Sequence, residues 1–165
     1  MLLRVTRRAS ASALRPSGHT RPAPLTMASR PRLLVVDDNS LNQLLLSEML
    51  QVLGYEADIE ADGRAAVSHC AATPPDGVLM DLQMPVMDGI EATRRIRELQ
   101  AERRIPHFPI VAATALTSLQ DREACMRAGM DGYLTKPLDL RSLAVELGRH
   151  VPAQREQPPG GTSSP

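Results

Sequence analysis

Chemically capable side chains follow the short apolar runs of this 165-residue chain. They are three carboxylates, a hydroxyl and an ammonium: Asp37, Asp38, Asp81, Thr114 and Lys136. Three carboxylates in one crevice would repel one another by about 4 kcal/mol per pair, at ~4 Å and an effective dielectric near ~20. Such a cluster calls for a cation or for raised pKa values. A hard cation answers this need, and ligands that are all oxygen favour Mg²⁺, with Mn²⁺ as the alternative ion. The residue types therefore predict a divalent-cation site.

Asp81 and Lys136 extend this chemistry to phosphoryl transfer. A carboxylate can attack phosphorus to give an aspartyl phosphate when cations neutralise the charge of the transferring group. Asp81 is the central carboxylate, and Lys136 is the only lysine in a chain with eighteen arginines. A compact ammonium suits one phosphate oxygen, and the Thr114 hydroxyl suits another. A pair of acids after a strand is by itself typical of a helix cap, so the prediction depends on the whole set.

These residues need a scaffold that brings distant segments together. Apolar runs of strand length are found at 33–36, 55–60, 78–80, 109–113 and 132–134. Helices are expected after caps or first residues at Ser40, Asp62, Asp88 or Gly89, Thr117 and Asp139. This alternation is typical of an α/β protein with a doubly wound parallel five-stranded sheet, a (βα)₅ fold. Functional groups in such sheets gather at the carboxyl edge, where the capable side chains fall.

The distribution of charge divides the chain into three segments. Residues 1–32 contain seven arginines and no acid, whereas residues 33–150 have a net charge of −7. We expect a disordered basic leader (residues 1–31), one domain (32–150) and a disordered Pro- and Gly-rich tail (151–165). The leader is interpreted as a targeting peptide, a nucleic-acid-binding arm or sequence upstream of a natural start at Met27. The last is favoured, because a core strand follows Met27 closely.

Composition argues against several classes of function. The chain has two Tyr, one Phe and no Trp, which leaves little for a base-stacking nucleic-acid platform. No apolar run approaches the roughly 20 residues of a membrane span, and no secretion signal is found. Cys70 and Cys125 lack metal-ligand spacing and are interpreted as buried thiols. We expect a cytoplasmic protein that binds neither nucleic acid nor membrane.

Four segments carry a resemblance to a known family: LLVVDDNSLNQ, GVLMDLQMPVMDGIEATRRIR, PIVAATAL and AGMDGYLTKPL. They resemble the receiver domain of two-component response regulators, and most of all the receivers of hybrid histidine kinases. The resemblance covers about residues 32–150. It implies a flavodoxin-like receiver fold that accepts a phosphoryl group from a histidine kinase or a histidine phosphotransfer protein.

The resemblance also implies roles for individual residues. It implies that Asp81 is the phosphoacceptor, and that Asp37 and Asp38 bind Mg²⁺ together with Asp81 and the backbone carbonyl of Gln83. Lys136 is the implied partner of phosphate and carboxylate.

Further implied roles concern the switch. Thr114 is the implied switch hydroxyl, and Tyr133 is the implied aromatic side chain that changes rotamer. The Lys136–Pro137 bond is cis in the family. Gln83 and Leu116 flank the phosphate and tune the lifetime of the signal.

The interpretation is therefore a single-domain response regulator that is not an enzyme beyond self-phosphorylation and self-dephosphorylation. An alternative is a phosphorelay intermediate or phosphate sink related to a hybrid-kinase receiver. A Mg²⁺-dependent aspartyl phosphatase of the haloacid dehalogenase type is disfavoured, because Gln83 occupies the place of the second acid that such enzymes need. A transcription factor would need an output domain after His150.

Smaller expectations concern residues outside the acidic cluster. The output face is expected on the fourth helix, fifth strand and fifth helix, with Leu119, Met126, Leu134 and Leu143. The histidines at 69, 107 and 150 are expected at the surface or at its boundary, without partner acids. The methionines at 80, 84 and 87 are expected to pack beneath the acceptor loop. The arginines at 94, 95, 97, 103 and 104 are expected to form a solvated face, with a partner-binding patch as the less favoured alternative.

Overall fold

The structure is a computed structural model that describes residues 29–152. Its strands are β1 (Arg32–Val36), β2 (Glu56–Glu60), β3 (Gly77–Met80), β4 (Ile110–Thr114) and β5 (Gly132–Thr135). Its helices are α1 (Ser40–Val52), α2 (Gly63–Ala72), α3 (Gly89–Ala101), α4 (Leu119–Ala128) and α5 (Leu140–His150). Nearly all of the predicted leader and of the predicted tail lies outside the described residues, so both expectations stay predictions.

All strands of the sheet pair in parallel, in the order β2-β1-β3-β4-β5. The predicted α/β fold, a doubly wound parallel (βα)₅ sheet, is confirmed. The order reverses between β1 and β3, so the chain winds first toward β2 and then toward β5. Clefts for ligands form at such a reversal, beyond the carboxyl ends of the strands.

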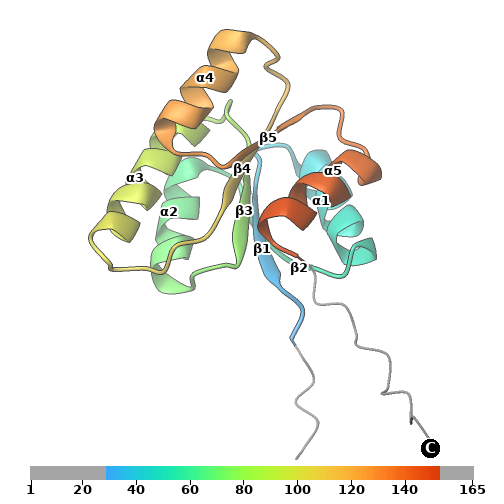
Figure 1. The fold of residues 1–165 in the computed structure, drawn as a ribbon, viewed down its shortest axis with the longest axis horizontal. Helices are drawn as coiled ribbons and strands as arrows, with labels where there is room; N and C mark the ends of the chain where they lie inside the picture. The colour runs from blue at the N-terminus through green and yellow to red at the C-terminus, as the bar shows by residue number, and fades with distance from the viewer. Residues whose placement is uncertain (1–28, 153–165) are drawn as a thin grey trace, which may run out of the picture.

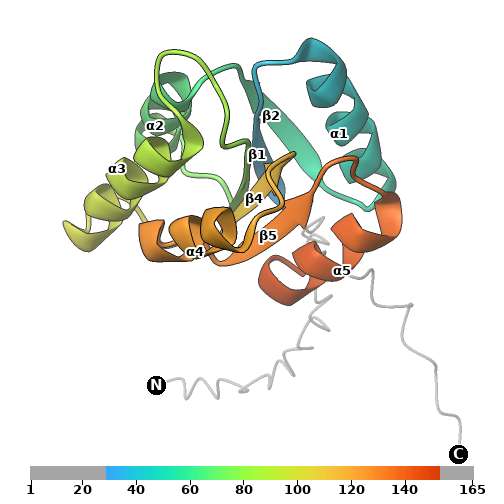
Figure 2. The ribbon, with the colours of Figure 1, turned by 90° about the horizontal axis from the view of Figure 1, so that it is seen from above.

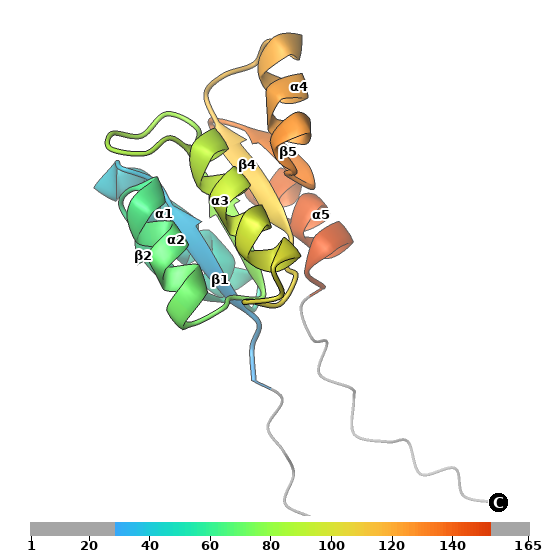
Figure 3. The ribbon, with the colours of Figure 1, turned by 90° about the vertical axis from the view of Figure 1, so that its left-hand side faces the viewer.

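Helices cover both faces of the sheet (Figure 1). Figure 2, seen from above, separates α2, α3 and α4 on one side from α1 and α5 on the other. Figure 3 looks onto the first side, where α2 and α3 lie in front of the strands. The central strands β3 and β4 are buried along their whole length, which explains their continuous apolar runs.

Each face of the sheet has its own aliphatic core. One core joins β1, β3 and β4 to the small and aliphatic residues of α2, α3 and α4, including Cys70 and Cys125. Met80 and Met87 are buried in this core and Met84 packs against it, which confirms the expected methionine packing. The other core joins the sheet to the leucines of α1 and α5. Both cysteines are free thiols, as predicted.

Two of the predicted helix caps are wrong by one residue. Asn39, not Ser40, caps α1, because its extended backbone lets the side chain accept the N–H groups of Leu41 and Asn42. Ser118, not Thr117, caps α4, where its hydroxyl accepts the N–H of Asp121. The caps at Asp62, Asp88 and Asp139 agree with the sequence.

Candidate functional site

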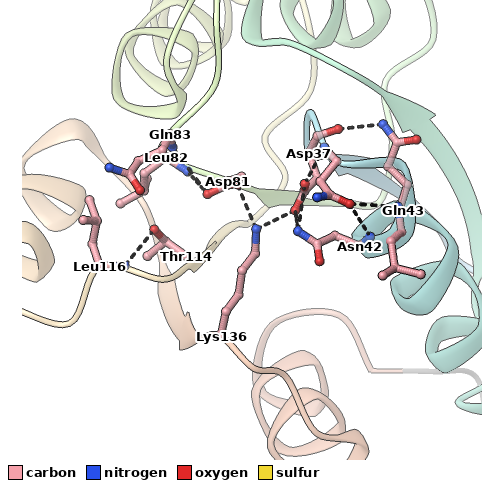
Figure 4. A network of polar contacts seen from close by, with 11 residues as sticks. Asp37, Asn42, Gln43, Asp81, Leu82, Gln83, Thr114, Leu116 and Lys136 are labelled. Atoms are coloured by element: carbon pink, nitrogen blue, oxygen red, sulfur yellow. Dashed lines mark hydrogen bonds and ion pairs between the residues drawn. The ribbon is translucent and has the colours of Figure 1, made fainter.

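The carboxyl edge of the sheet brings together the side chains that the sequence singled out (Figure 4). Asp37 follows β1, Asp81 follows β3, Thr114 ends β4 and Lys136 follows β5. Asp37, Asp38 and Asp81 each offer a carboxylate oxygen, and these three oxygens lie within 4.8 Å of one another. Asp37 and Asp81 are buried, whereas Asp38 is exposed. The acidic cluster therefore consists of two buried carboxylates and one carboxylate that is open to solvent.

Asp37 is the most enclosed carboxylate, with 1% of its surface exposed. Its Oδ1 accepts the backbone N–H of Asn39 at 2.9 Å, and the side-chain amide of Asn42 reaches both carboxylate oxygens, at 3.1 and 3.2 Å. The Gln43 side chain donates to the Asp37 backbone carbonyl at 2.6 Å. The first turns of α1 thus hold Asp37 in place.

Asp81 is held by the backbone that follows it. Its Oδ1 accepts the N–H of Leu82 at 2.7 Å and that of Gln83 at 3.3 Å. The loop returns to this point at Gly89, whose N–H binds the carbonyl of Leu82 and where an added Cβ would overlap the backbone oxygen of Asp81. Gly89 therefore permits the close approach of α3 that fixes Asp81.

Lys136 joins the two buried carboxylates. Its Nζ lies 2.6 Å from Asp37 Oδ2 and 2.8 Å from Asp81 Oδ2. Burial of the ammonium opposes its charged form, but the hydrogen bonds to Asp37 and Asp81 outweigh burial and raise the pKa of Lys136. The ammonium stays charged between the carboxylates. The peptide bond from Lys136 to Pro137 is cis.

Thr114 and Tyr133 meet at the backbone of Leu116. The buried Thr114 hydroxyl accepts the N–H of Leu116 at 3.2 Å, and the Tyr133 hydroxyl donates to the Leu116 carbonyl. Burial raises the pKa of Tyr133, so the hydroxyl keeps its proton. Leu116 is thus bound from both sides. Together with Gln83 it also lines a cavity of about 290 Å³ beside α4.

Sequence reasoning missed three residues of this site. Asn42 and Gln43 donate to Asp37, and Gly89 makes room for Asp81. Their signals were an amide pair one turn into the helix that follows the acidic pair and a glycine eight residues after Asp81. From the sequence, Asp88 and Gly89 were interpreted only as the start of a helix.

The expected output face is half wrong. Leu119 and Met126 are exposed, by 72% and 50%. Leu134 and Leu143 are instead buried in the core between the sheet and α1 and α5. A leucine on β5 and one on α5 fill the space between these elements. The linear sequence does not distinguish the face of these elements that packs in the core from the face that points to solvent.

Two expectations about charged residues are wrong in part. His69 lies between two acids of the edge strand β2, with Nδ1 3.0 Å from Glu60 and Nε2 3.4 Å from Asp58, and the His150 ring is 3.4 Å from Glu146. Arg97 departs from the solvated arginine run. Its side chain is 17% exposed, and its guanidinium binds Asp131 at 2.6 Å.

The fold and the site define the class: a doubly wound α/β domain with an acidic, oxygen-lined site at its topological switch point. The profile of the response regulator receiver domain matches residues 33–147. The chain belongs to this family of phosphoacceptor signalling modules.

Relatives of known sequence and structure agree with this assignment. The chain is 43% identical over 120 residues to the sensor histidine kinase GacS of Pseudomonas protegens, a match that covers 72% of this chain and 13% of the relative. It is 39% identical over 125 residues to hybrid signal transduction histidine kinase L of Dictyostelium discoideum, across 72% of this chain and 7% of the relative. The chain thus spans a small part of the length of these kinases.

Two solved structures share the fold. The receiver domain of sensor histidine kinase PA1611 from Pseudomonas aeruginosa, described with a magnesium ion coordinated in its active site cleft, is 42% identical. Its TM-score is 0.65, over 73% of this chain and 96% of that one. The chemotaxis protein CheY4 of Vibrio cholerae has a TM-score of 0.66 at 30% identity, over 73% and 98%. Within residues 29–152, none of the helices has both the length and the apolar character needed to cross a membrane.

Proposed function

We propose that this chain is a phosphoacceptor switch in which Asp81 takes a phosphoryl group from the phosphohistidine of a histidine kinase or histidine phosphotransfer protein. The observation that carries the proposal is the Asp81 carboxylate itself. The Asp81 residue is 7% exposed, and its carboxylate belongs to the acidic cluster and binds the Lys136 ammonium at 2.8 Å. An oxygen of Asp81 would form the new O–P bond as the P–N bond to the donor imidazole breaks.

The residues around Asp81 fit a divalent cation. Three carboxylate oxygens within 4.8 Å of one another form a hard-oxygen donor set that suits Mg²⁺, with Mn²⁺ as the alternative. In the proposal Asp37, Asp38, Asp81 and the backbone carbonyl of Gln83 hold the ion. When bound, the ion neutralises charge on the transferring phosphoryl group. The magnesium described in the Pseudomonas aeruginosa receiver supports this assignment.

Thr114, Leu116 and Tyr133 are the proposed switch. Phosphorylation adds roughly one net negative charge at Asp81. The Thr114 hydroxyl turns toward that charge, releases the N–H of Leu116 and so changes the backbone that the Tyr133 hydroxyl binds. A shift from 1:99 to 99:1 needs about 5.5 kcal/mol, and one charge-assisted hydrogen bond contributes about 1.5–3. Thr114 and Lys136 must therefore act together.

In this proposal the chain is a cytoplasmic, single-domain response regulator. It binds a downstream protein through α4, β5 and α5. Gln83 and Leu116 would set how long the phosphoryl group survives. A phosphorelay intermediate or phosphate sink is the second candidate, and the 43% identity to a sensor histidine kinase favours it. The two differ in destination: a regulator keeps the phosphoryl group, whereas an intermediate passes it to another histidine.

Phosphotransfer from labelled donors tests the proposal. Histidine kinases and phosphotransfer proteins carrying labelled phosphohistidine should pass the label to the wild-type chain in the presence of Mg²⁺. Asp81→Asn should take up none. Label that reaches the variant as fast as the wild type would contradict the role of Asp81.

Hydrolysis of small phosphate esters separates the switch from a phosphatase. Because Gln83 occupies the place of the second acid, the chain should release no more phosphate from such esters than buffer does. Sustained turnover that Asp81→Asn abolishes would instead establish a phosphatase.

A further inference from the structure

Asn42 has the most specific contact at the site that no role above explains. Its Nδ2 lies 3.1 Å from Asp37 Oδ1 and 3.2 Å from Asp37 Oδ2, so one amide bridges both oxygens of a buried carboxylate. Figure 4 shows the Asn42 side chain extending from α1 to the carboxylate of Asp37. The contact joins the first turn of α1 to the end of β1.

The two carboxylate oxygens of Asp37 differ in their hydrogen-bond partners. Oδ1 accepts the N–H of Asn39 at 2.9 Å as well as the Asn42 amide. Oδ2 accepts Lys136 at 2.6 Å, and the same ammonium binds Asp81. Oδ1 therefore faces the turn that opens α1, and Oδ2 faces the acidic cluster. A ligand bound among the three carboxylates would use Oδ2.

Rotation of the Asp37 carboxylate must be restrained for Oδ2 to keep this direction. The terminal torsion of an aspartate is soft and roughly two-fold, so burial alone does not fix it. The Asn39 N–H binds only one oxygen. The Asn42 amide contacts both oxygens. It is neutral, so it supplies a donor without placing a fourth negative charge beside Asp37.

We propose that Asn42 is a positioning residue for the cation site, which holds Asp37 so that Oδ2 is presented to a divalent cation. The inference rests on the proposed function, because it assigns a residue to the same site. Outer donors that orient a ligating carboxylate typically change metal affinity by about 10–100-fold when they are removed. Asn42 should fall in this range.

Gln43 supplies a matched control. It is the next residue of α1, it is also half-buried, and its side-chain amide also binds Asp37. Its acceptor, however, is the backbone carbonyl of Asp37 and not the carboxylate. Loss of Gln43 removes a link between α1 and β1 but leaves the carboxylate donors in place. A purely structural role would make the two residues equivalent.

Calorimetric titration with Mg²⁺ alone tests the inference on the wild type, Asn42→Ala and Gln43→Ala. Asn42→Ala should weaken Mg²⁺ binding by about 10–100-fold. Gln43→Ala should change it by less than about 3-fold, because the carboxylate keeps its donors. Asn42→Leu, which keeps side-chain bulk without an amide, should repeat the loss and replaces the alanine variant if that variant does not fold by circular dichroism.

Labelling by acetyl phosphate gives a second readout. The Mg²⁺ concentration for half-maximal labelling should rise in the Asn42 variants by the same factor as the dissociation constant. Asn42 variants that bind Mg²⁺ as tightly as the wild type would overturn the inference alone, as would an equal loss in Gln43→Ala. A wild-type chain that binds no Mg²⁺ would overturn the proposed function as well.

Discussion

Close contact between Gly89 and the acceptor segment shows how strongly single positions constrain the site. A Cβ at residue 89 would overlap the backbone oxygen of Asp81 and lie 3.0 Å from the Cα of Leu82. Both neighbours are backbone atoms, so they cannot rotate away as a side chain would. The residue after Asp88 therefore controls where Asp81 lies.

Gly89→Ala should destabilise the fold by about 1–3 kcal/mol, the usual cost of overpacking a tight site. Urea unfolding measures the change. Gly148→Ala is the control: it lies in α5 with no atom within 4 Å of an added Cβ, and alanine there should stabilise the helix by up to about 1 kcal/mol. Equal effects at the two glycines would contradict the contact.

Cys70 predicts a pH dependence of stability. Burial raises the pKa of its thiol from 9.0 to about 12. Above pH 9 the unfolded chain loses the thiol proton while the folded chain keeps it, so ionisation favours unfolding by about 1.4 kcal/mol per pH unit up to the folded pKa. Below pH 9 both states are protonated and the thiol adds no slope.

Unfolding free energies of the wild type and Cys70→Ala across this range provide the test. The difference between the two chains should be constant below pH 9. Above it, the wild type should lose stability relative to the variant, because only the wild type carries the buried thiol. Parallel curves up to pH 11 would show that Cys70 ionises as easily in the folded chain.

At the scale of elements, Arg97 ties α3 to the end of α4. Its guanidinium donates to the carbonyls of Gly129 at 2.8 Å and Phe108 at 2.9 Å, and to the Asp131 carboxylate at 2.6 Å. Asp131 also accepts the N–H of Ile110, the first residue of β4. The carboxyl end of α4 is thus anchored, whereas Leu119 at its amino end is 72% exposed.

A double-mutant cycle of Arg97→Met and Asp131→Asn should give a coupling free energy of about 0.5–3 kcal/mol, as contacting residues in one network do. Arg95 and Glu91 form an exposed pair on the same helix, where the coupling should be only about 0.3–0.5 kcal/mol. Chemical denaturation of both sets decides the point. Coupling at Arg97 no larger than at Arg95 would contradict the anchor.

The sequence predicts where the strands end better than it predicts how the helices pack against them. Asp81 and Lys136 were predictable because apolar runs of strand length end beside them and parallel strands align their carboxyl ends. The burial of Leu134 and Leu143 was not, because it depends on how α5 packs against β5. The acids beside His69 were missed for the same reason: they come from a strand that turns them toward α2.

The same limit applies to the candidate site. Asp37 was assigned from its place after a strand, but its orientation depends on donors from α1, which only the fold brings together. Ser118 and Asn39 show the same limit for a single residue, because the sequence did not identify which of two neighbours caps the helix. Adjacent polar residues can all cap a helix, and backbone conformation chooses between them.

At the scale of the whole molecule, the ends of the described chain lie away from the site. β1 begins at Arg32, and the buried Val151 accepts the Tyr55 hydroxyl at 2.6 Å. The carbonyl of Pro31 likewise binds the N–H of Glu56, at the start of β2. The acidic cluster occupies the opposite edge of the sheet. Because both cores share the sheet, we expect a cation bound at this edge to stabilise the domain as one unit.

Thermal unfolding with and without Mg²⁺ measures this coupling. At a Mg²⁺ concentration about 100 times the dissociation constant, binding should stabilise the folded chain by about 2.7 kcal/mol. A chelator should remove the effect. In Asp37→Asn, Mg²⁺ should leave the melting temperature unchanged, whatever the melting temperature of this variant is without the ion. A Mg²⁺-dependent shift as large as that of the wild type would place the ion elsewhere.

The most direct test of the central claim is to map the phosphoryl group after incubation with acetyl phosphate and Mg²⁺. We expect one acid-labile phosphoryl group per chain, carried by the peptide that contains Asp81. We also expect no label in Asp81→Asn and none in the wild type once Mg²⁺ is removed. Label that persists undiminished in Asp81→Asn, or that maps to another residue, would contradict the role of Asp81 as the phosphoacceptor.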